Sequence, residues 1–269
     1  MHRSAAGLGH ERVRRVGIIG AGVISAIHAE ALARVPNVRI AAVIEPNQEA
    51  ANRFARQWNV PQVFASVAEA IESDAMDAAH VLVPPPIHAG ATLPLLAAGK
   101  SVLVEKPLAV TVAECEALQH AAAEGGAVLA ANQNFVFHPA FLRLRGLLDA
   151  GRFGRPLSVL CTYSVPLRQL ASRQFGHWMF RAPGNILLEQ AVHPLSQIMA
   201  LAGAMRDVRA VAEPGTEISP GVRFHAGVNA TLDCEGLPAQ LSFAVGRSFP
   251  VWQVSVLCDD GVIVADILA

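Results

Sequence analysis

The stretch 101–110, SVLVEKPLAV, places an acid and a lysine at the end of what looks like a buried strand. Its β-branched run ends in Glu105, Lys106 and Pro107, and apolar sequence then resumes. A solvated turn is the commonest explanation for a Glu-Lys pair. The alternative is catalytic, because an ammonium beside an alcohol lowers the cost of negative charge on its oxygen. The elements around the pair decide between the two.

A second stretch, VGIIGAGVIS at 16–25, has the glycine spacing of a nucleotide-binding loop. Gly20 permits a tight turn between a strand and a helix, and Gly22 has no Cβ to keep the backbone from a pyrophosphate at the helix N-terminus. Ser25 stands at the third glycine position of the usual motif and is small enough for close helix–strand packing. Such turns also occur without ligands, so the loop alone is a weak signal.

Glu45 strengthens the nucleotide hypothesis. It ends the second apolar run, twenty residues after Ser25, where a carboxylate binds the adenosine ribose hydroxyls in dinucleotide-binding folds. The same carboxylate would repel a 2′-phosphate, which favours NAD over NADP. A solvated strand end is the structural alternative.

The third stretch, NILLEQAVHPLSQI at 185–198, spaces Glu189 and His193 four residues apart, so that a helix puts both on one face. A histidine with an unperturbed pKa of about 6.5 can exchange a proton near neutral pH. A histidine packed on an apolar helix face and bonded to a carbonyl is the structural alternative. Pro194 removes a backbone donor and predicts a kink beside His193.

The elements expected around these residues form two domains. Over 13–130, short apolar runs alternate with helical stretches, two of which begin with the capping-box pairs Ser66–Glu69 and Thr111–Glu114. Strands alternating with helices predict βαβ units and a parallel sheet covered on both faces. Domain 1–130 is therefore expected to be an α/β, doubly wound Rossmann domain.

After about residue 131 the pattern changes. Two helices, about 139–150 and 185–202, are expected among strand-like runs separated by turn signals such as Asp260-Gly261. Hairpins at this spacing predict an antiparallel sheet. Residues 131–269 should form an α+β domain with a mainly antiparallel open sheet.

Composition excludes several classes of protein. The 269 residues carry 21 Lys+Arg against 22 Asp+Glu, and a net charge of −1 gives no basis for binding nucleic acid or an anionic membrane. Although 52% of the residues are hydrophobic, no run reaches the about 18 apolar residues of a spanning helix. The N-terminal stretch 1–15 lacks the apolar core of a secretory signal. The four cysteines form no metal or redox pair, so we expect a cytoplasmic protein with free thiols and no metal.

In chain order, GAGVIS, VPPPIHAGATLPLLAAGKSVLVEKPLAVT and EQAVHPL resemble the glucose-fructose oxidoreductase / inositol dehydrogenase / MocA (Gfo/Idh/MocA) family of NAD(P)-dependent dehydrogenases. The resemblance extends over nearly the whole chain. The E-K-P signature with its upstream Pro, His and Gly-Lys is specific, whereas the glycine loop is not. The resemblance implies that Lys106 contacts the substrate hydroxyl and that its peptide bond to Pro107 is cis. It also implies that His193 is the general acid/base, oriented by Glu189 where the family has an Asp.

The resemblance also suggests which residues line the two binding sites. Those expected at the cofactor are Gly20, Gly22, Val23, Ile24, Glu45, Pro84, His88, Glu105 and Lys106. Those expected at the substrate are Lys106, Asn134, Trp178, Gln190 and His193.

Several positions depart from the family pattern. Pro85 replaces an Asn that helps to position the cofactor, Val136 replaces an Arg, and Ser196 replaces an acid three residues after the histidine. The stretch APGN at 182–185 stands where the family has three consecutive glycines. These changes predict altered cofactor and substrate contacts. The last residues, VIVADILA, lie inside the expected sheet, which fits either a short family member or a truncated chain.

Together these observations predict an enzyme that transfers a hydride between NAD, or alternatively NADP, and a secondary alcohol or carbonyl of a sugar, cyclitol or related polyol. Two alternatives stay open: a non-catalytic NAD(P)-binding regulator on the same fold, and a carbonyl or imine reductase of the dihydrodiol-dehydrogenase type. A regulator needs neither Lys106 nor His193, and both are present. Besides a small carbohydrate-like substrate, the expected partner is a second copy of the chain, in a homodimer or homotetramer formed through the C-terminal sheet.

Overall fold

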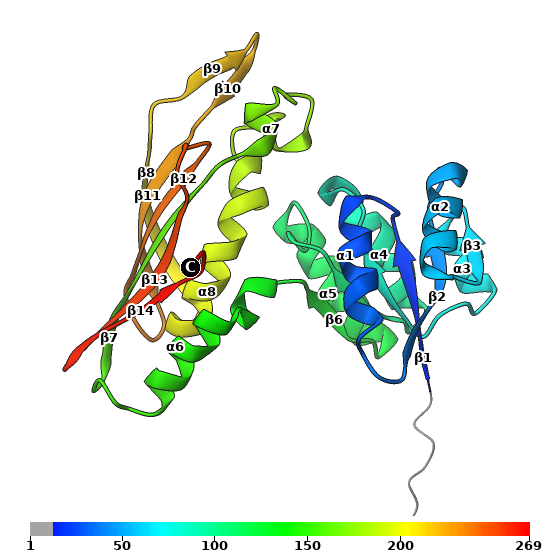
Figure 1. The fold of residues 1–269 in the computed structure, drawn as a ribbon, viewed down its shortest axis with the longest axis horizontal. Coiled ribbons are helices and arrows are strands. Elements are labelled where there is room, and N and C mark those ends of the chain that lie inside the picture. The colour runs from blue at the N-terminus through cyan, green and yellow to red at the C-terminus, as the bar shows by residue number, and fades with distance from the viewer. Residues whose placement is uncertain (1–12) are drawn as a thin grey trace, which may run out of the picture. The chain divides into compact units, whose positions relative to one another are not determined.

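The computed structural model describes residues 13–269, which form two compact units (Figure 1). The first unit ends at Asn132 and the second begins at Gln133, two residues after the boundary expected from the sequence. Residues 1–12, which include most of the N-terminal stretch considered as a signal, lie outside the described residues.

The first unit is a six-stranded parallel sheet with strand order β3-β2-β1-β4-β5-β6. This is the doubly wound topology predicted from the alternation of apolar runs and helical stretches. The strands are β1 (Arg14–Ile19), β2 (Val38–Ile44), β3 (Gln62–Phe64), β4 (Ala78–Val81), β5 (Ser101–Val104) and β6 (Leu129–Ala131). The helices are α1 (Val23–Leu32), α2 (Gln48–Trp58), α3 (Val67–Glu72), α4 (His88–Ala97) and α5 (Val112–Gly125), with a 3-10 turn, η1 (Pro85–Ile87), before α4.

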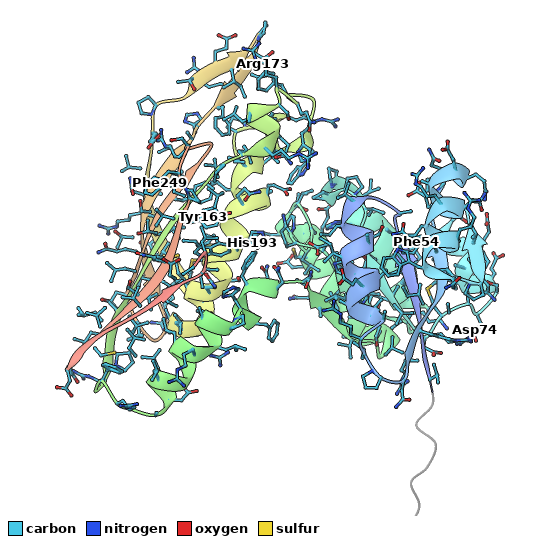
Figure 2. All side chains as sticks on the ribbon, viewed as in Figure 1. Phe54, Asp74, Tyr163, Arg173, His193 and Phe249 are labelled. Carbon is cyan, nitrogen blue, oxygen red and sulfur yellow. The ribbon has the colours of Figure 1, made fainter. Side chains whose placement is uncertain are left out.

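Side chains that alternate along the buried strands form two hydrophobic cores, one on each face of this sheet. Val16 and Ile18 of β1 belong to the cluster that includes Phe54 of α2, labelled in Figure 2. Their neighbour Ile19 belongs to the cluster that includes Leu118 of α5. Because successive side chains of a strand point to opposite faces, α1 and α2 cover one face of the sheet, and α3, α4 and α5 cover the other.

One of the two predicted capping boxes forms completely. Thr111 Oγ1 accepts from the amide of Glu114, and the Glu114 carboxylate accepts from the amide of Thr111. Ser66 Oγ accepts from the amide of Glu69, but Glu69 Oε2 accepts from the amide of Ala65, one residue before the cap. The prediction of a reciprocal box at Ser66 was therefore wrong in its second half.

The second unit is built on a six-stranded sheet with order β14-β13-β7-β12-β11-β8. β7 and β12 pair in parallel, and the other four pairs are antiparallel, as expected for an α+β domain. The strands are β7 (Pro156–Val165), β8 (Met205–Ala212), β11 (Gly227–Cys234), β12 (Ala239–Val245), β13 (Val251–Cys258) and β14 (Gly261–Asp266), with a separate hairpin of β9 (Thr216–Ser219) and β10 (Val222–Phe224). The helical elements are η2 (Asn134–Phe137), α6 (Pro139–Asp149), α7 (Arg168–Ala171), η3 (Trp178–Phe180), η4 (Leu187–Ala191) and α8 (Val192–Ala202).

One face of this second sheet is covered and the other is open. Figure 1 shows α6 and α8 against the covered face, where Phe141 of α6 and Ile198 of α8 pack with inward residues of the strands. The alternate side chains are on the open face, where Val211 and Val264 are exposed. The open sheet predicted from the sequence is confirmed.

The helix expected over about 185–202 is divided in the structure. A π-helical turn, η4, precedes α8, and Pro194 lies in the first turn of α8. Proline has no N–H to donate to the carbonyl of Gln190, four residues earlier, so a regular α-helical ladder cannot run through this point. A π turn accommodates the missing bond because its hydrogen bonds close on the fifth residue. The predicted kink at Pro194 is thus a change of helix type just before His193.

Three further features bear on the class of protein. No helix within 13–269 is long and apolar enough to cross a bilayer. All four cysteines are free thiols. Within the same residues, no three metal-ligating side chains gather into a group that could hold an ion.

Candidate active site

The glycine loop joins β1 to α1 and leaves open space in front of the helix. Gly20 has φ of +96°, and a Cβ there would lie 3.2 Å from the Leu82 carbonyl, so a glycine is required. A Cβ on Gly22 would meet no heavy atom within 4 Å. Gly22 caps α1 without a side-chain bond, so the first amides of the helix, from Val23 and Ile24, have no intrahelical acceptor. A loop with these features fits a pyrophosphate.

Glu45 follows β2, and two backbone amides hold its carboxylate. Oε2 accepts from the amide of Ala21 at 3.0 Å, and Oε1 accepts from the amide of Asn47 at 2.9 Å. The acid is therefore fixed beside the glycine loop, and each oxygen keeps a lone pair for a ribose hydroxyl. Arg53, the first cation after Glu45, pairs with Glu49 at 3.6 Å, and its side chain is 63% exposed. This geometry suits the adenosine ribose of NAD.

Glu105 and Lys106 directly follow β5, at the carboxyl edge of the sheet where doubly wound folds bind their ligands. Glu105 Oε1 accepts from His28 Nε2 at 2.9 Å and from Asn132 Nδ2 at 2.5 Å. Its Oε2 accepts from the backbone amide of Lys106 at 3.1 Å. The peptide between Lys106 and Pro107 is cis, as the resemblance implied. The carboxylate of Glu105 therefore ties the backbone of Lys106 to α1 and to the end of β6.

A histidine pair extends this network. His28 Nδ1 of α1 lies 3.0 Å from His80 Nδ1 of β4, with the rings edge to face at a centroid distance of 5.1 Å. Burial, together with the charge of His28, lowers the pKa of His80 to about 4. Burial on its own would raise the pKa of Glu105, but hydrogen bonds from His28 and Asn132 outweigh it and bring that pKa below its ordinary value. Near neutral pH, Glu105 is therefore an anion and His80 is neutral.

His88 does not occupy the cofactor-facing position that the resemblance implied. Its side chain is 0% exposed, and its ring nitrogens lie 2.7 Å from the Pro107 carbonyl and 2.8 Å from the Val83 carbonyl. Both nitrogens thus face backbone oxygens, and the ring connects the loop after β4 to the loop after β5. The expectation of a direct cofactor contact at His88 is corrected accordingly. Pro84, exposed at the start of η1, stays a candidate contact.

In the second unit, His193 lies against an aromatic wall. It is 9% exposed, in the first turn of α8, with the ring of Phe135 edge to face at 5.0 Å and the ring of Trp252 at 6.1 Å. One turn later, Gln197 fixes this arrangement: its Nε2 donates to the Phe135 carbonyl at 3.0 Å, and its Oε1 accepts from Trp252 Nε1 at 2.9 Å. The wall restricts the orientations that the imidazole can adopt.

The π turn η4 carries two more of the predicted residues. Glu189 Oε2 accepts from Trp178 Nε1 at 2.8 Å, and Gln190 Oε1 accepts from the hydroxyl of Tyr163 at 2.8 Å. Burial raises the pKa of Tyr163 above its usual range, so this hydroxyl keeps its proton. Figure 2 labels Tyr163 on β7 and His193 on α8. Trp178 is 8% exposed and donates to Glu189, and its contact with the substrate stays a prediction.

Some expected residues stay predictions. Asn134 is exposed in η2, as a substrate contact requires. The orientation of His193 by Glu189 also stays a prediction.

The residues that hold these groups in place were not among the site residues predicted from the sequence. They are His28, His80, Asn132, Tyr163, Gln197 and Trp252. A signal was present for some of them, since His80 interrupts an apolar run and Tyr163 is the one tyrosine of the chain. Their partners are distant in sequence, so the type of residue alone does not predict the contact.

Comparison with known protein families shows the family of this chain. Residues 14–133 match the model described as "Oxidoreductase family, NAD-binding Rossmann fold", and residues 141–264 match the "GFO/IDH/MocA C-terminal domain". The chain belongs to the Gfo/Idh/MocA family. The fold and the family expected from the three motifs are confirmed.

Two curated relatives act on sugars by name. The chain is 28% identical over 230 residues to a 1,5-anhydro-D-fructose reductase of Ensifer adhaerens, an alignment covering 81% of this chain and 68% of the relative. It is 32% identical over 201 residues to a dTDP-3,4-didehydro-2,6-dideoxy-alpha-D-glucose 3-reductase of Streptomyces violaceoruber, covering 74% of this chain and 57% of the relative. The chain thus spans little more than half the length of the second relative.

A solved structure supports the fold. The scyllo-inositol dehydrogenase of Lactobacillus casei, solved with NAD(H) and scyllo-inositol, superposes with a TM-score of 0.81 and 19% identity, over 94% of this chain and 76% of that one.

Proposed function

We propose that this protein is an NAD(P)-dependent oxidoreductase that transfers a hydride between the nicotinamide and a secondary alcohol or carbonyl of a sugar, cyclitol or related polyol. The observation that carries this proposal is Lys106, held by Glu105 at the carboxyl end of β5. The same sheet presents a glycine loop and a fixed Glu45 that suit a dinucleotide. When bound, the dinucleotide supplies or accepts the hydride.

Each residue has a role that its chemistry supports. The ammonium of Lys106 stabilises negative charge that develops on the reacting oxygen. His193 takes up or returns the proton of that oxygen. Glu189, held by Trp178, orients His193, and Gln190 and Asn134 bind hydroxyl groups of the substrate.

Reduction of a carbonyl is the second candidate for the direction of the reaction. Two relatives are named as reductases of a keto sugar and of a didehydro sugar nucleotide, which favours this direction. The same two proton-handling residues serve both directions, because a reversible step uses one set of groups.

A substrate screen tests the proposal. The full chain is assayed with inositols, aldoses and amino sugars in the presence of NAD or NADP, and with keto sugars in the presence of NADH or NADPH. We expect turnover with at least one polyol or keto sugar, followed by nicotinamide absorbance. Dinucleotide binding without turnover on any of these compounds would favour the non-catalytic regulator.

We also propose that the chain works as a homo-oligomer assembled through the open face of the second sheet. Val211 is 75% exposed and Val264 is 55% exposed on this face, and apolar side chains at such positions suit a self-complementary interface. The four free thiols support a reducing compartment, for which we propose the cytoplasm.

A further inference from the structure

Glu105 is the centre of a network that joins four elements of the first unit. Its carboxylate accepts from His28 of α1, from Asn132 after β6 and from the backbone amide of Lys106. His28 in turn contacts His80 of β4. Glu105 and Lys106 belong to a motif singled out from the sequence, whereas His28, Asn132 and His80 do not.

The two imidazoles can share protons in two ways. An Nδ1-to-Nδ1 distance of 3.0 Å requires one nitrogen to donate and the other to accept. His28 Nε2 carries a hydrogen because it faces the ionised Glu105. When His28 is neutral, its Nδ1 accepts from Nδ1–H of His80. When His28 is protonated, its Nδ1 donates, and His80 shifts its single hydrogen to Nε2.

Both states satisfy the same contacts without moving a heavy atom. The pair can therefore take up one proton at a site where α1, β4 and the ends of β5 and β6 contribute His28, His80, Glu105 and the uncharged Asn132. The second proton of the pair is opposed by burial, which keeps the pKa of His80 low. A coupled pair of this kind titrates as a unit.

We propose that Glu105 is a positioning residue for Lys106, and that the His28–His80 pair is a proton-binding site that sets the charge of the network beside Lys106. This inference rests on the proposed function, because Lys106 is the group that it serves. With the pair neutral, the network has a charge of −1, from Glu105, and this negative charge stabilises the ammonium of Lys106. With one proton on the pair, the network is neutral and that support is lost.

Two replacements of His28 separate its effect on the position of Lys106 from its effect on protonation of the His28–His80 pair. His28→Gln keeps a donor toward Glu105 and an acceptor toward His80 but cannot bind a proton. His28→Leu keeps neither. We expect His28→Leu to lower kcat by about 10- to 100-fold through displacement of Lys106, with KM for NAD within a few-fold of the wild type. We expect His28→Gln to keep kcat within a few-fold at alkaline pH.

The pH profile of kcat/KM for alcohol oxidation gives the deciding readout. On the acid side, the logarithm of kcat/KM should fall with a slope approaching about two in the wild type, from His193 and from the pair, and about one in His28→Gln. The control is His120→Gln, which removes an exposed histidine that pairs with Glu124 at 3.2 Å; its profile should match the wild type. Equal slopes in the wild type and His28→Gln would show that the pair has no part in the reaction, while the proposed function would stand.

A measurement without substrate tests the pair directly. In the full chain labelled with ¹⁵N-histidine, the His80 hydrogen should move from Nδ1 to Nε2 between pH 9 and pH 5 as the pair takes up its proton. His28→Gln and His80→Gln assign the signals. If both rings keep one tautomer and one charge over this range, the inference is wrong. If the tautomers change but no polyol or keto sugar is turned over, the proton site stands and the proposed function fails.

Discussion

Lys106 and His193 allow catalysis to be separated from cofactor binding by single replacements. Neither residue belongs to the glycine loop or contacts Glu45 in the bonds that hold it. We therefore expect Lys106→Ala and His193→Ala to leave the Kd for NAD within a few-fold. Each should lower kcat, by about 10²- to 10⁴-fold for the residue that transfers the proton.

Titration calorimetry with NAD and steady-state kinetics with the substrate found by the screen measure the two effects. Lys100→Ala is the matched control, since Lys100 binds Asp74, a residue labelled in Figure 2, at 2.6 Å and should affect neither quantity. A collapse of NAD affinity in His193→Ala contradicts this division of roles.

Cofactor preference depends on Glu45. Its carboxylate is fixed by the amides of Ala21 and Asn47 and cannot turn away from a 2′-phosphate without losing these bonds. Two unit charges 4 Å apart repel by about 4 kcal/mol at an effective dielectric constant of about 20, and water at the rim reduces this. We expect kcat/KM for NAD to exceed that for NADP by at least about tenfold, or about 1.4 kcal/mol.

Glu45→Ser should narrow the gap between the cofactors mainly by admitting NADP, measured as kcat/KM with each dinucleotide. Glu49→Ser, in the first turn of α2, where Glu49 pairs with Arg53, is the control and should keep the preference. Equal use of NADP by the wild type would mean that Glu45 does not face the ribose.

Motif residues could be predicted from the sequence, whereas the residues that hold them could not. The spacing of Gly20, Gly22 and Glu45 reflects one local unit, a strand, a turn and a helix, so it is visible in the chain itself. Glu105, which follows β5, depends on Asn132 after β6 and on His28 of α1. Contacts of that kind follow from the folded sheet and not from any local pattern.

At the scale of single elements, the complete capping box at the start of α5 should contribute measurably to stability. Thr111 Oγ1 accepts from the amide of Glu114 at 3.2 Å, and Glu114 Oε2 accepts from the amide of Thr111 at 3.1 Å. Thr111→Ala leaves one amide without its side-chain acceptor and should lower the free energy of unfolding by about 1 kcal/mol.

Urea denaturation followed by circular dichroism measures this change. Thr111→Ser keeps the hydroxyl and should stay within a few tenths of a kcal/mol of the wild type. A loss as large in Thr111→Ser as in Thr111→Ala would assign the effect to the lost methyl group and not to the cap.

Most elements could be predicted because their local signals agree with the final packing. The runs that became β1, β2, β4 and β5 are mainly apolar, as strands buried on both faces require, and α2, α3 and α5 begin at capping side chains. The π turn η4 could not be predicted in this way. Pro194 shows that the ladder must break, but the form of the break also depends on Trp178 and Tyr163, which bond to Glu189 and Gln190 from other elements.

At the scale of the whole chain, the two units have separate cores. The clusters around Ile18 and Leu118 belong to the first unit, and the cluster around Phe141 belongs to the second. The change of sequence pattern near residue 131 predicted this division because each half has its own periodicity, first of βαβ units and then of hairpins. Local periodicity does not reveal what binds to the open face of the second sheet.

The open face of the second sheet is the surface that we propose for the contact between copies of the chain. A hollow of about 530 Å³ lies over β7, β8, β11 and β12, lined by residues that include Leu160, Val211 and Gln240. Charged residues are depleted at the centre of protein interfaces because their burial is costly. A lysine introduced on this face should therefore oppose self-association without disturbing the core beneath.

We expect Val211→Lys and Val264→Lys to shift the protein toward the monomer, each raising the dissociation constant by at least about tenfold, or about 1.4 kcal/mol. Light scattering after size-exclusion chromatography measures the mass, and circular dichroism should be unchanged because both positions are exposed. Val112→Lys, at a residue 73% exposed in α5 of the first unit, carries the same change of charge and should keep the wild-type mass. If all three variants keep that mass, the copies associate through another surface. If the wild type is already monomeric at assay concentrations, the proposed contact between copies through the open sheet does not form.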